Sequence, residues 1–197
     1  MMDDDIEVRP ARGVAARGRT PGARAIRRGL LVLLTGDGKG KSTAAWGMAL
    51  RAAGRGRPVR VFQFTKAPSA RAGEYRAFAR LGVPVDVLGE GFDWDCRDAD
   101  HCLHLAGQSW ARAREAIESG DHFMVILDDL TYPLRQGWLP LDEVLLVLRN
   151  RPAHVHVVVT GRNAPQDLVD MADTVTRMGL TKHHYMAGVP SQRGIED

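Results

Sequence analysis

The stretch that most constrains this chain is residues 30–43, LLVLLTGDGKGKST, where an apolar run enters a glycine-rich turn that ends in Gly-Lys-Ser. Glycines at positions 36, 38 and 40 let the backbone curl, so that successive N–H groups point inward at a bound anion. Residues 42–53 follow with a helical pattern, and the amino-terminal dipole of such a helix favours the same anion. The sequence therefore predicts a strand, a phosphate-binding loop (P-loop) and a helix.

This loop predicts a nucleotide site, and its residue types indicate what each position does. Lys41 supplies positive charge to the phosphates, and the Ser42 hydroxyl is a ligand for Mg²⁺. Thr35 stands where the usual pattern begins with glycine, so the loop is a variant, and a simple turn is the alternative interpretation. The predicted ATP-binding residues of the loop are Gly36, Asp37, Gly38, Lys39, Gly40, Lys41, Ser42 and Thr43.

A second signal is the segment 123–129, FMVILDD, an apolar strand that delivers two carboxylates at its carboxyl end. Behind a P-loop, such carboxylates hold Mg²⁺ directly or through water and help to neutralise a triphosphate. We expect Ser42, Asp128 and Asp129 to form this magnesium site. The alternative is an aspartate pair that caps a loop facing solvent.

Short β-rich runs alternate with helical stretches along the rest of the chain, which is typical of a parallel sheet with crossover helices. The predicted fold is α/β, a mostly parallel sheet of about six strands with helices on both faces, similar to RecA-like P-loop NTPases. Strands are expected at 30–34, 59–65, 83–88, 123–128, 155–160 and 174–176, and helices at 42–53, 73–81, 99–119, 141–150 and 164–172.

Charge divides the chain unevenly. Residues 1–28 hold seven arginines and four acidic residues, which accounts for the whole net charge of +3. We expect a flexible Arg-rich tail over 1–28 and one folded domain over 29–197, and the neutral charge of that domain argues against nucleic-acid binding. No apolar run approaches the roughly 20 residues of a membrane span, and two cysteines are too few for a disulfide framework. We therefore expect a cytoplasmic protein that does not bind membranes.

Six short motifs match one known family in order and spacing, from about residue 29 onward. The motifs are TGDGKGKSTAA at 35–45, FQFTK at 62–66, GFDW at 91–94, LDDLTY at 127–132, TGR at 160–162 and KH at 182–183. Together they resemble the P-loop corrinoid adenosyltransferases. The resemblance implies an enzyme of adenosylcobalamin biosynthesis that transfers the 5′-deoxyadenosyl group of ATP to the Co(I) of cobalamin or cobyrinic acid a,c-diamide and releases triphosphate.

This implied reaction needs no nucleophile or base from the protein, because Co(I) is itself a strong nucleophile. The site has to position the reactants and stabilise charge. Lys41, the loop N–H groups and Mg²⁺ would stabilise the departing triphosphate. The resemblance also implies that ATP lies along the loop in the reverse sense, which presents C5′ to the cobalt.

The resemblance further assigns residues around the corrinoid. Phe92 and Trp94 would form an apolar wedge that removes the lower cobalt ligand, so that a flavin-dependent reductase or flavodoxin can reduce the metal. From the residues alone, two aromatics in a Gly- and Asp-rich segment are unusual, and the alternative interpretation is that they anchor the loop to the core. Arg162 is expected to contact ATP, and Lys182 and His183 are expected near the corrinoid. A homodimer is implied by the family alone.

Three positions depart from the family pattern. Asp129 stands where glutamate is usual, Met186 where aspartate is expected, and the chain ends at Asp197 without the common aromatic. These changes indicate reduced activity, an altered corrinoid preference or a divergent paralogue, and they keep open the alternative of a catalytically impaired protein that binds ATP or corrinoid. A P-loop ATPase or phosphotransferase is a separate alternative, although no clear candidate for the base or positioned water that it needs is visible in the sequence.

Overall fold

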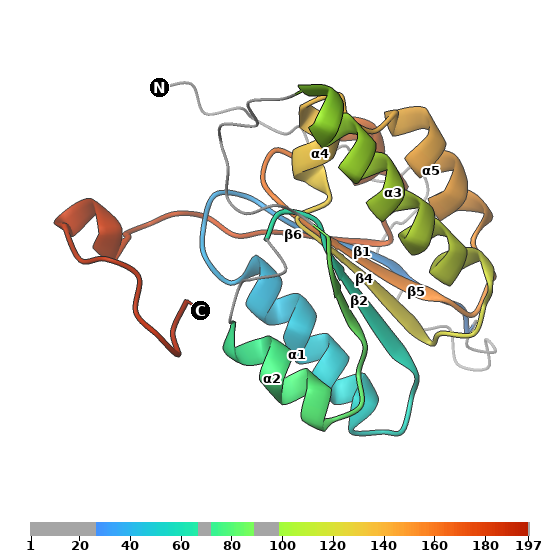
Figure 1. Ribbon diagram of the computed structural model, residues 1–197, viewed down its shortest axis with the longest axis horizontal. Coiled ribbons are helices and arrows are strands. Elements are labelled where there is room, and N and C mark those ends of the chain that lie inside the picture. Colours follow the sequence, from blue (N-terminus) through green and yellow to red (C-terminus); the bar gives the residue numbers. More distant parts are fainter. Residues whose placement is uncertain (1–26, 67–71, 89–98, 197) are drawn as a thin grey trace, which may run out of the picture.

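The computed structural model describes residues 27–66, 72–88 and 99–196 (Figure 1). Six strands form one sheet in which every pairing is parallel. The strands are β1 (Leu31–Thr35), β2 (Val59–Gln63), β3 (Val85–Val87), β4 (Met124–Asp128), β5 (His156–Thr160) and β6 (Thr174–Arg177), in the spatial order β3-β2-β4-β5-β1-β6. The predicted α/β fold with a parallel sheet is confirmed. Phe92, Trp94 and the 1–26 segment lie outside the described residues, so the division at residue 28 stays a prediction.

The helices are α1 (Lys41–Ala53), α2 (Gly73–Arg80), α3 (Ala99–Glu118), α4 (Thr131–Arg135), α5 (Leu141–Asn150) and α6 (Gln166–Met171), with a 3₁₀ turn at His184–Ala187. All predicted strands and helices are present, each with both ends within two residues of the expected bounds. Neither α4 nor the 3₁₀ turn is predicted from the sequence, because elements of five and four residues are too short to display a helical period. No helix among the described residues is long and apolar enough to cross a membrane.

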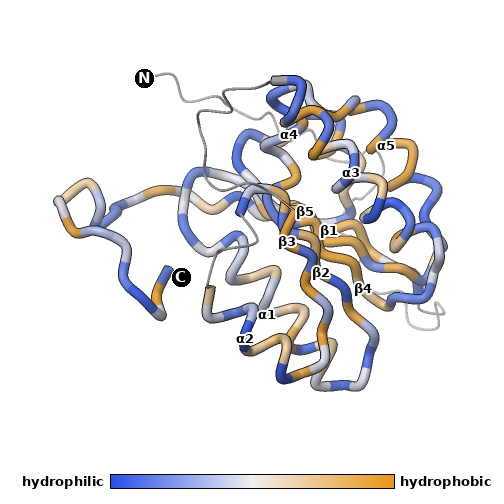
Figure 2. Tube along the Cα trace, in the orientation of Figure 1, coloured by the Kyte–Doolittle hydropathy of each residue, from blue (hydrophilic) through white to orange (hydrophobic). Residues whose placement is uncertain are grey.

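Helices cover both faces of the sheet, and the alternation of strand side chains explains why (Figures 1 and 2). On β1, Leu33 belongs to the core layer shared with α3, α5 and α6, whereas Leu34 belongs to the layer shared with α1 and α2. On β4, Leu127 and Ile126 divide in the same way. Strands buried on both faces are nearly all apolar, as Figure 2 shows. The few buried polar residues on these strands are therefore candidates for a functional site.

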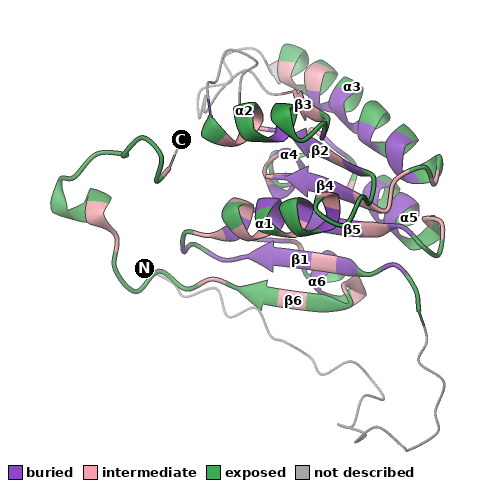
Figure 3. Cartoon of the chain, turned by 90° about the horizontal axis from the view of Figure 1, so that it is seen from below, coloured by how far each residue is buried: buried purple, intermediate pink, exposed green. Residues whose placement is uncertain are grey.

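The outer parts of the fold are more exposed. β6 is an edge strand with mostly exposed residues, and the chain beyond it extends away from the helices and the sheet (Figures 1 and 3). We call residues 178–196 the C-terminal segment. Most of its residues are exposed in Figure 3, so its position is fixed by the contacts described below rather than by a core.

Candidate functional site

The carboxyl ends of four neighbouring strands carry the central polar groups of the site. β2 ends at Gln63, β4 at Asp128, β5 at Thr160 and β1 at Thr35. All four are buried, with at most 1% of their surface exposed. The register sets Gln63 beside Asp128. Because the strands are parallel, their polar ends collect at one edge of the sheet, which is where open α/β sheets bind ligands.

The loop between β1 and α1 has the backbone geometry of an anion-binding turn. Gly36 and Gly40 have φ angles of 96° and 111°, a region that glycine adopts without strain. The carbonyl of Gly40 accepts the N–H of Ala44 at 2.8 Å, which starts α1 directly after the turn. The predicted strand, loop and helix are therefore all present.

Lys41 lies at the start of α1 with only 9% of its surface exposed. Its Nζ donates a hydrogen bond to the carbonyl of Gly38 at 2.7 Å. Burial, followed by the positive charge of Arg162, lowers the pKa of Lys41, while three aspartates of the site oppose this shift. A buried ammonium that is held by one carbonyl is well placed to gain from an arriving anion.

Asp128 is fully buried and held by side chains from three elements. Its Oδ1 accepts a hydrogen bond from Thr160 Oγ1 at 2.6 Å. Its Oδ2 accepts from Gln63 Nε2 at 3.1 Å and from Trp46 Nε1, on α1, at 3.3 Å. These donors fix the plane of the carboxylate. None of the three was assigned a role from sequence, although Thr160 is a polar residue at the end of a predicted strand and Gln63 lies inside one.

Burial and the nearby Asp129 raise the pKa of Asp128 to about 6, and hydrogen bonds from Thr160, Ser42 and Trp46 oppose the rise. Ser42, in the first turn of α1, therefore lies near the end of β4. The magnesium site expected at Ser42, Asp128 and Asp129 stays a prediction.

Asp129 differs from its neighbour in geometry. Its backbone has a φ of 59°, which is uncommon for a residue with a side chain, and its N–H donates to Thr160 Oγ1 at 2.9 Å. Its Oδ2 accepts a hydrogen bond from Thr65 Oγ1 at 3.0 Å. Such a left-handed residue turns the chain sharply at the strand end. Asp128 and Asp129 are adjacent in sequence, but their carboxylates accept hydrogen bonds from different side chains.

The Gln63 side chain makes hydrogen bonds in two directions at the end of β2. The Gln63 side-chain oxygen accepts the backbone N–H groups of Thr65 at 2.7 Å and of Lys66 at 2.9 Å. Its amide nitrogen meanwhile donates to Asp128. One buried glutamine thus connects the loop after β2 to the carboxylate of β4.

Arg162 follows β5 and is exposed. Its positive charge contributes to the lowered pKa of Lys41. Its carbonyl accepts a hydrogen bond from Thr131 Oγ1, at the start of α4, at 2.7 Å. A Cβ built on Gly161 would lie 1.9 Å from Thr131 Oγ1, so the close approach of Thr131 requires glycine at position 161. Arg162 is therefore close enough to affect the pKa of Lys41, and its role in ATP binding stays a prediction.

The C-terminal segment is hydrogen-bonded to the P-loop through its first residues. The carbonyl of Met178 accepts the N–H of Gly38 at 2.8 Å, and the N–H of Met178 donates to the carbonyl of Thr35 at 2.8 Å. The Gly38 N–H of the loop therefore donates to the protein backbone rather than pointing at a bound anion. This contact was not foreseen from sequence, because nothing in the residue pattern pairs positions 140 residues apart.

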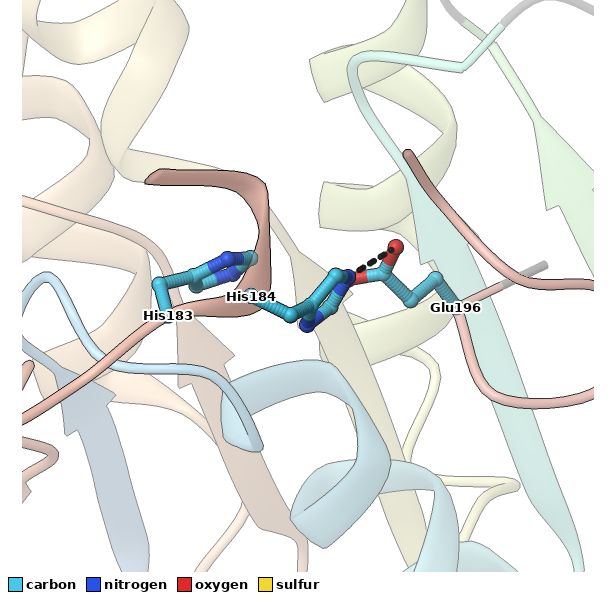
Figure 4. Close-up of side chains that lie close together, drawn as sticks. All are labelled: His183, His184 and Glu196. Carbon is cyan, nitrogen blue, oxygen red and sulfur yellow. Dashed lines mark hydrogen bonds and ion pairs between the residues drawn. The ribbon is translucent and has the colours of Figure 1, made fainter. Parts of the chain in front are cut away.

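The end of the C-terminal segment returns to the same loop. Lys39 forms an ion pair with Glu196, whose other oxygen lies 3.3 Å from His184 Nε2 (Figure 4). His183 stacks on His184 with ring centroids 4.6 Å apart, and its Nδ1 accepts the N–H of Tyr185. His183, His184 and Glu196 have ligand atoms within 4.8 Å of one another, but their hydrogen bonds and the Lys39 pair already account for this arrangement.

The remaining predicted positions divide into two groups. The negative charge of Asp37 opposes the lowering of the Lys41 pKa. Thr43 is an exposed residue of α1. Lys182 is exposed in the C-terminal segment, as is Met186. Phe92 and Trp94, the predicted wedge, lie outside the described residues. The ATP-binding and corrinoid-binding roles of these residues therefore stay predictions.

Comparison with known proteins identifies the family. A model of the family described as ATP:corrinoid adenosyltransferase BtuR/CobO/CobP matches residues 27–196. A corrinoid adenosyltransferase of Pseudomonas aeruginosa is 43% identical over 171 residues, which cover 86% of this chain and 84% of that protein. A corrinoid adenosyltransferase of Sinorhizobium sp is 37% identical over 189 residues (94% and 88%), and one of Escherichia coli K12 is 38% identical over 169 residues (86% of each). The match spans the P-loop, the strand-end carboxylates and the C-terminal segment together, and the chain therefore belongs to the ATP:corrinoid adenosyltransferase family.

Proposed function

We propose that the P-loop and the row of strand ends bind ATP and transfer its 5′-deoxyadenosyl group to the Co(I) of a reduced corrinoid. The observation that carries this proposal is a pair of buried charged residues at the loop. Lys41 donates a hydrogen bond to the Gly38 carbonyl, and Asp128 lies near Ser42, the residue after Lys41. A buried cation beside a turn of backbone N–H groups is suited to a polyphosphate.

In this reaction the cobalt electron pair attacks C5′ of ATP, so a Co–C bond forms and the C5′–O bond breaks. The bonding pair leaves with the triphosphate, and the cobalt is formally oxidised from Co(I) to Co(III). Charge grows on the leaving triphosphate, so Lys41, Arg162 and the loop N–H groups that remain free stabilise it most when the bond breaks. No proton transfer is needed, which fits a site whose carboxylates are held by hydrogen bonds rather than aimed as bases.

The donors at the loop also suit Mg²⁺. Hydroxyl and carboxylate oxygens are the ligands that this cation prefers. Ser42 and Asp129 would hold the ion, and Asp128 would act directly, through water or through Ser42, since its oxygens already accept several hydrogen bonds. The bound ion would neutralise part of the triphosphate charge.

The corrinoid side of the proposal rests on the family resemblance. Phe92 and Trp94 would exclude the lower ligand, Lys182 and His183 would lie near the corrinoid, and a flavin-dependent reductase or flavodoxin would supply the electron. A homodimer in the cytoplasm is part of the same proposal. The substrate is cobalamin or cobyrinic acid a,c-diamide.

The experiment is an anaerobic reaction of the purified protein with Mg·ATP and chemically reduced cob(I)alamin or cob(I)yrinic acid a,c-diamide. We expect a light-sensitive adenosylated corrinoid and one triphosphate for each Co–C bond formed. ADP and phosphate without a Co–C bond would instead support an ATPase or phosphotransferase. Binding of ATP without any turnover of either corrinoid would support an impaired paralogue, with Asp129 and Met186 as the first positions to restore.

The wedge has its own test. Trp94→Ala should spare turnover with chemically reduced Co(I) but reduce it with Co(II) and a flavin reductant, because only the second assay requires loss of the lower ligand. Equal losses in both assays would contradict the wedge role.

A further inference from the structure

Trp46 lies on α1, five residues after the P-loop lysine, with 6% of its surface exposed. Two residues of α2 hold its ring. The Phe78 ring meets it edge-on at a centroid distance of 5.0 Å, and the Tyr75 ring lies tilted at 5.7 Å. These contacts fix the orientation of the indole, and its N–H points at Asp128 Oδ2, 3.3 Å away.

The bond from Trp46 completes the set of donors around Asp128. Gln63 shares the same oxygen, whereas Thr160 holds the other oxygen. An indole N–H can only donate, so this contact requires an acceptor at Oδ2. These three donors oppose rotation of the carboxylate, which lies near Ser42 of the P-loop.

We propose that Trp46 is a positioning residue of the metal–nucleotide site: its indole N–H holds the Asp128 carboxylate in a fixed orientation near Ser42. A carboxylate held in this way can accept a hydrogen bond from the Ser42 hydroxyl, which leaves the oxygen lone pairs of Ser42 for a cation. This inference rests on the proposed binding of Mg·ATP. It predicts that Trp46 affects the contribution of Mg²⁺ to ATP binding rather than ATP binding itself.

A purely structural role for Trp46 makes a different prediction, because the ring also belongs to the core between α1 and α2. Trp46→Phe retains an aromatic ring for Tyr75 and Phe78 but removes the N–H donor. If Trp46 only fills the core, this variant should alter stability and leave the effect of Mg²⁺ on ATP affinity unchanged.

Trp110 offers a matched control. It is buried, with 3% of its surface exposed, and its Nε1 also lies 3.3 Å from a carboxylate oxygen, that of Glu143. It is on α3, in the core layer on the opposite face of the sheet from Trp46. Trp110→Phe therefore removes the same kind of hydrogen bond far from the P-loop.

The test is isothermal titration calorimetry of ATP binding to full-length protein, with Mg²⁺ and with EDTA in its place. The readout is the ratio of the two affinities, which is insensitive to a loss of active protein. We expect Trp46→Phe to reduce this ratio about tenfold, since a hydrogen bond to a charged group is lost, and to leave the EDTA affinity unchanged. Trp110→Phe should keep the wild-type ratio. In an Asp128→Asn background, Trp46→Phe should have no further effect.

A wild-type ratio in Trp46→Phe, or an equal loss of affinity with Mg²⁺ and with EDTA, would overturn this inference and leave the proposed function intact. If the wild-type protein binds ATP equally well with Mg²⁺ and EDTA, the proposed metal role fails and this inference fails with it. A similar fall of the ratio in Trp110→Phe would assign the effect to general destabilisation, which also overturns the proposal.

Discussion

Gly38→Ala tests how closely the C-terminal segment is held against the P-loop. A Cβ at this position would lie 2.4 Å from the carbonyl oxygen of Gly179 and 2.8 Å from that of Met178. Both neighbours are backbone atoms, so no side chain can rotate to make room. The Gly38 N–H also donates to Met178, which prevents the loop from withdrawing without losing that bond.

The cost can be worked out from these contacts in two ways. If the chain stays in place, overpacking of this kind costs about 1–3 kcal/mol. If Met178 moves away, its two backbone hydrogen bonds to the loop are lost, at about 0.5–1.5 kcal/mol each. Both routes give about 1–3 kcal/mol, which in a protein of this size lowers the melting temperature by roughly 2–12 °C.

Thermal unfolding followed by circular dichroism measures this change, and Gly47→Ala is the control. Gly47 is an exposed residue of α1 with no atom within 4 Å of an added Cβ. Alanine should stabilise the helix there by about 0.5–1 kcal/mol. Gly38→Ala should in addition weaken ATP binding. If Gly38→Ala melts at the wild-type temperature and binds ATP normally, the segment does not pack on the loop as described.

Three further predictions follow from single contacts. Lys41→Met should weaken ATP binding about ten- to hundredfold by calorimetry, because a hydrogen-bonded charge opposite the phosphates is lost; unchanged binding would remove Lys41 from the site. Glu196→Gln should lower the KM for ATP by at most about fivefold in steady-state assays at low salt, since the carboxylate no longer competes for Lys39, and an increase in KM would contradict this. The hydrogen bond from Arg28 lowers the pKa of Asp173, so this carboxylate stabilises the folded protein above its unfolded-state pKa, and the stabilisation is lost as the pH falls through the lowered value. Asp173→Asn should therefore reduce stability by about 1–2 kcal/mol at pH 7 in urea titrations, and the difference should shrink below about pH 4; a constant difference would refute it.

The fold could be predicted because each element carries its own local signal. Strands buried on both faces must be apolar over four to six residues, and a P-loop requires glycine where φ is positive, as at Gly36 and Gly40. The first and last residues of each element are predicted less accurately than the element itself. The strand predicted at 83–88 is only Val85–Val87, and the helix predicted at 164–172 begins two residues later, after Pro165.

The sequence by itself determined the chemical inventory of the site: a glycine-rich turn, Lys41, Ser42 and two carboxylates after an apolar strand. Tertiary structure alone decided which of these groups meet. Strand order, which no local pattern specifies, brings Thr160 and Gln63 to opposite sides of Asp128 and adds Trp46 from α1. The same holds for the hydrogen bonds between Met178 and the P-loop, because contacts between residues far apart in the chain depend on how the whole sheet assembles rather than on residue spacing.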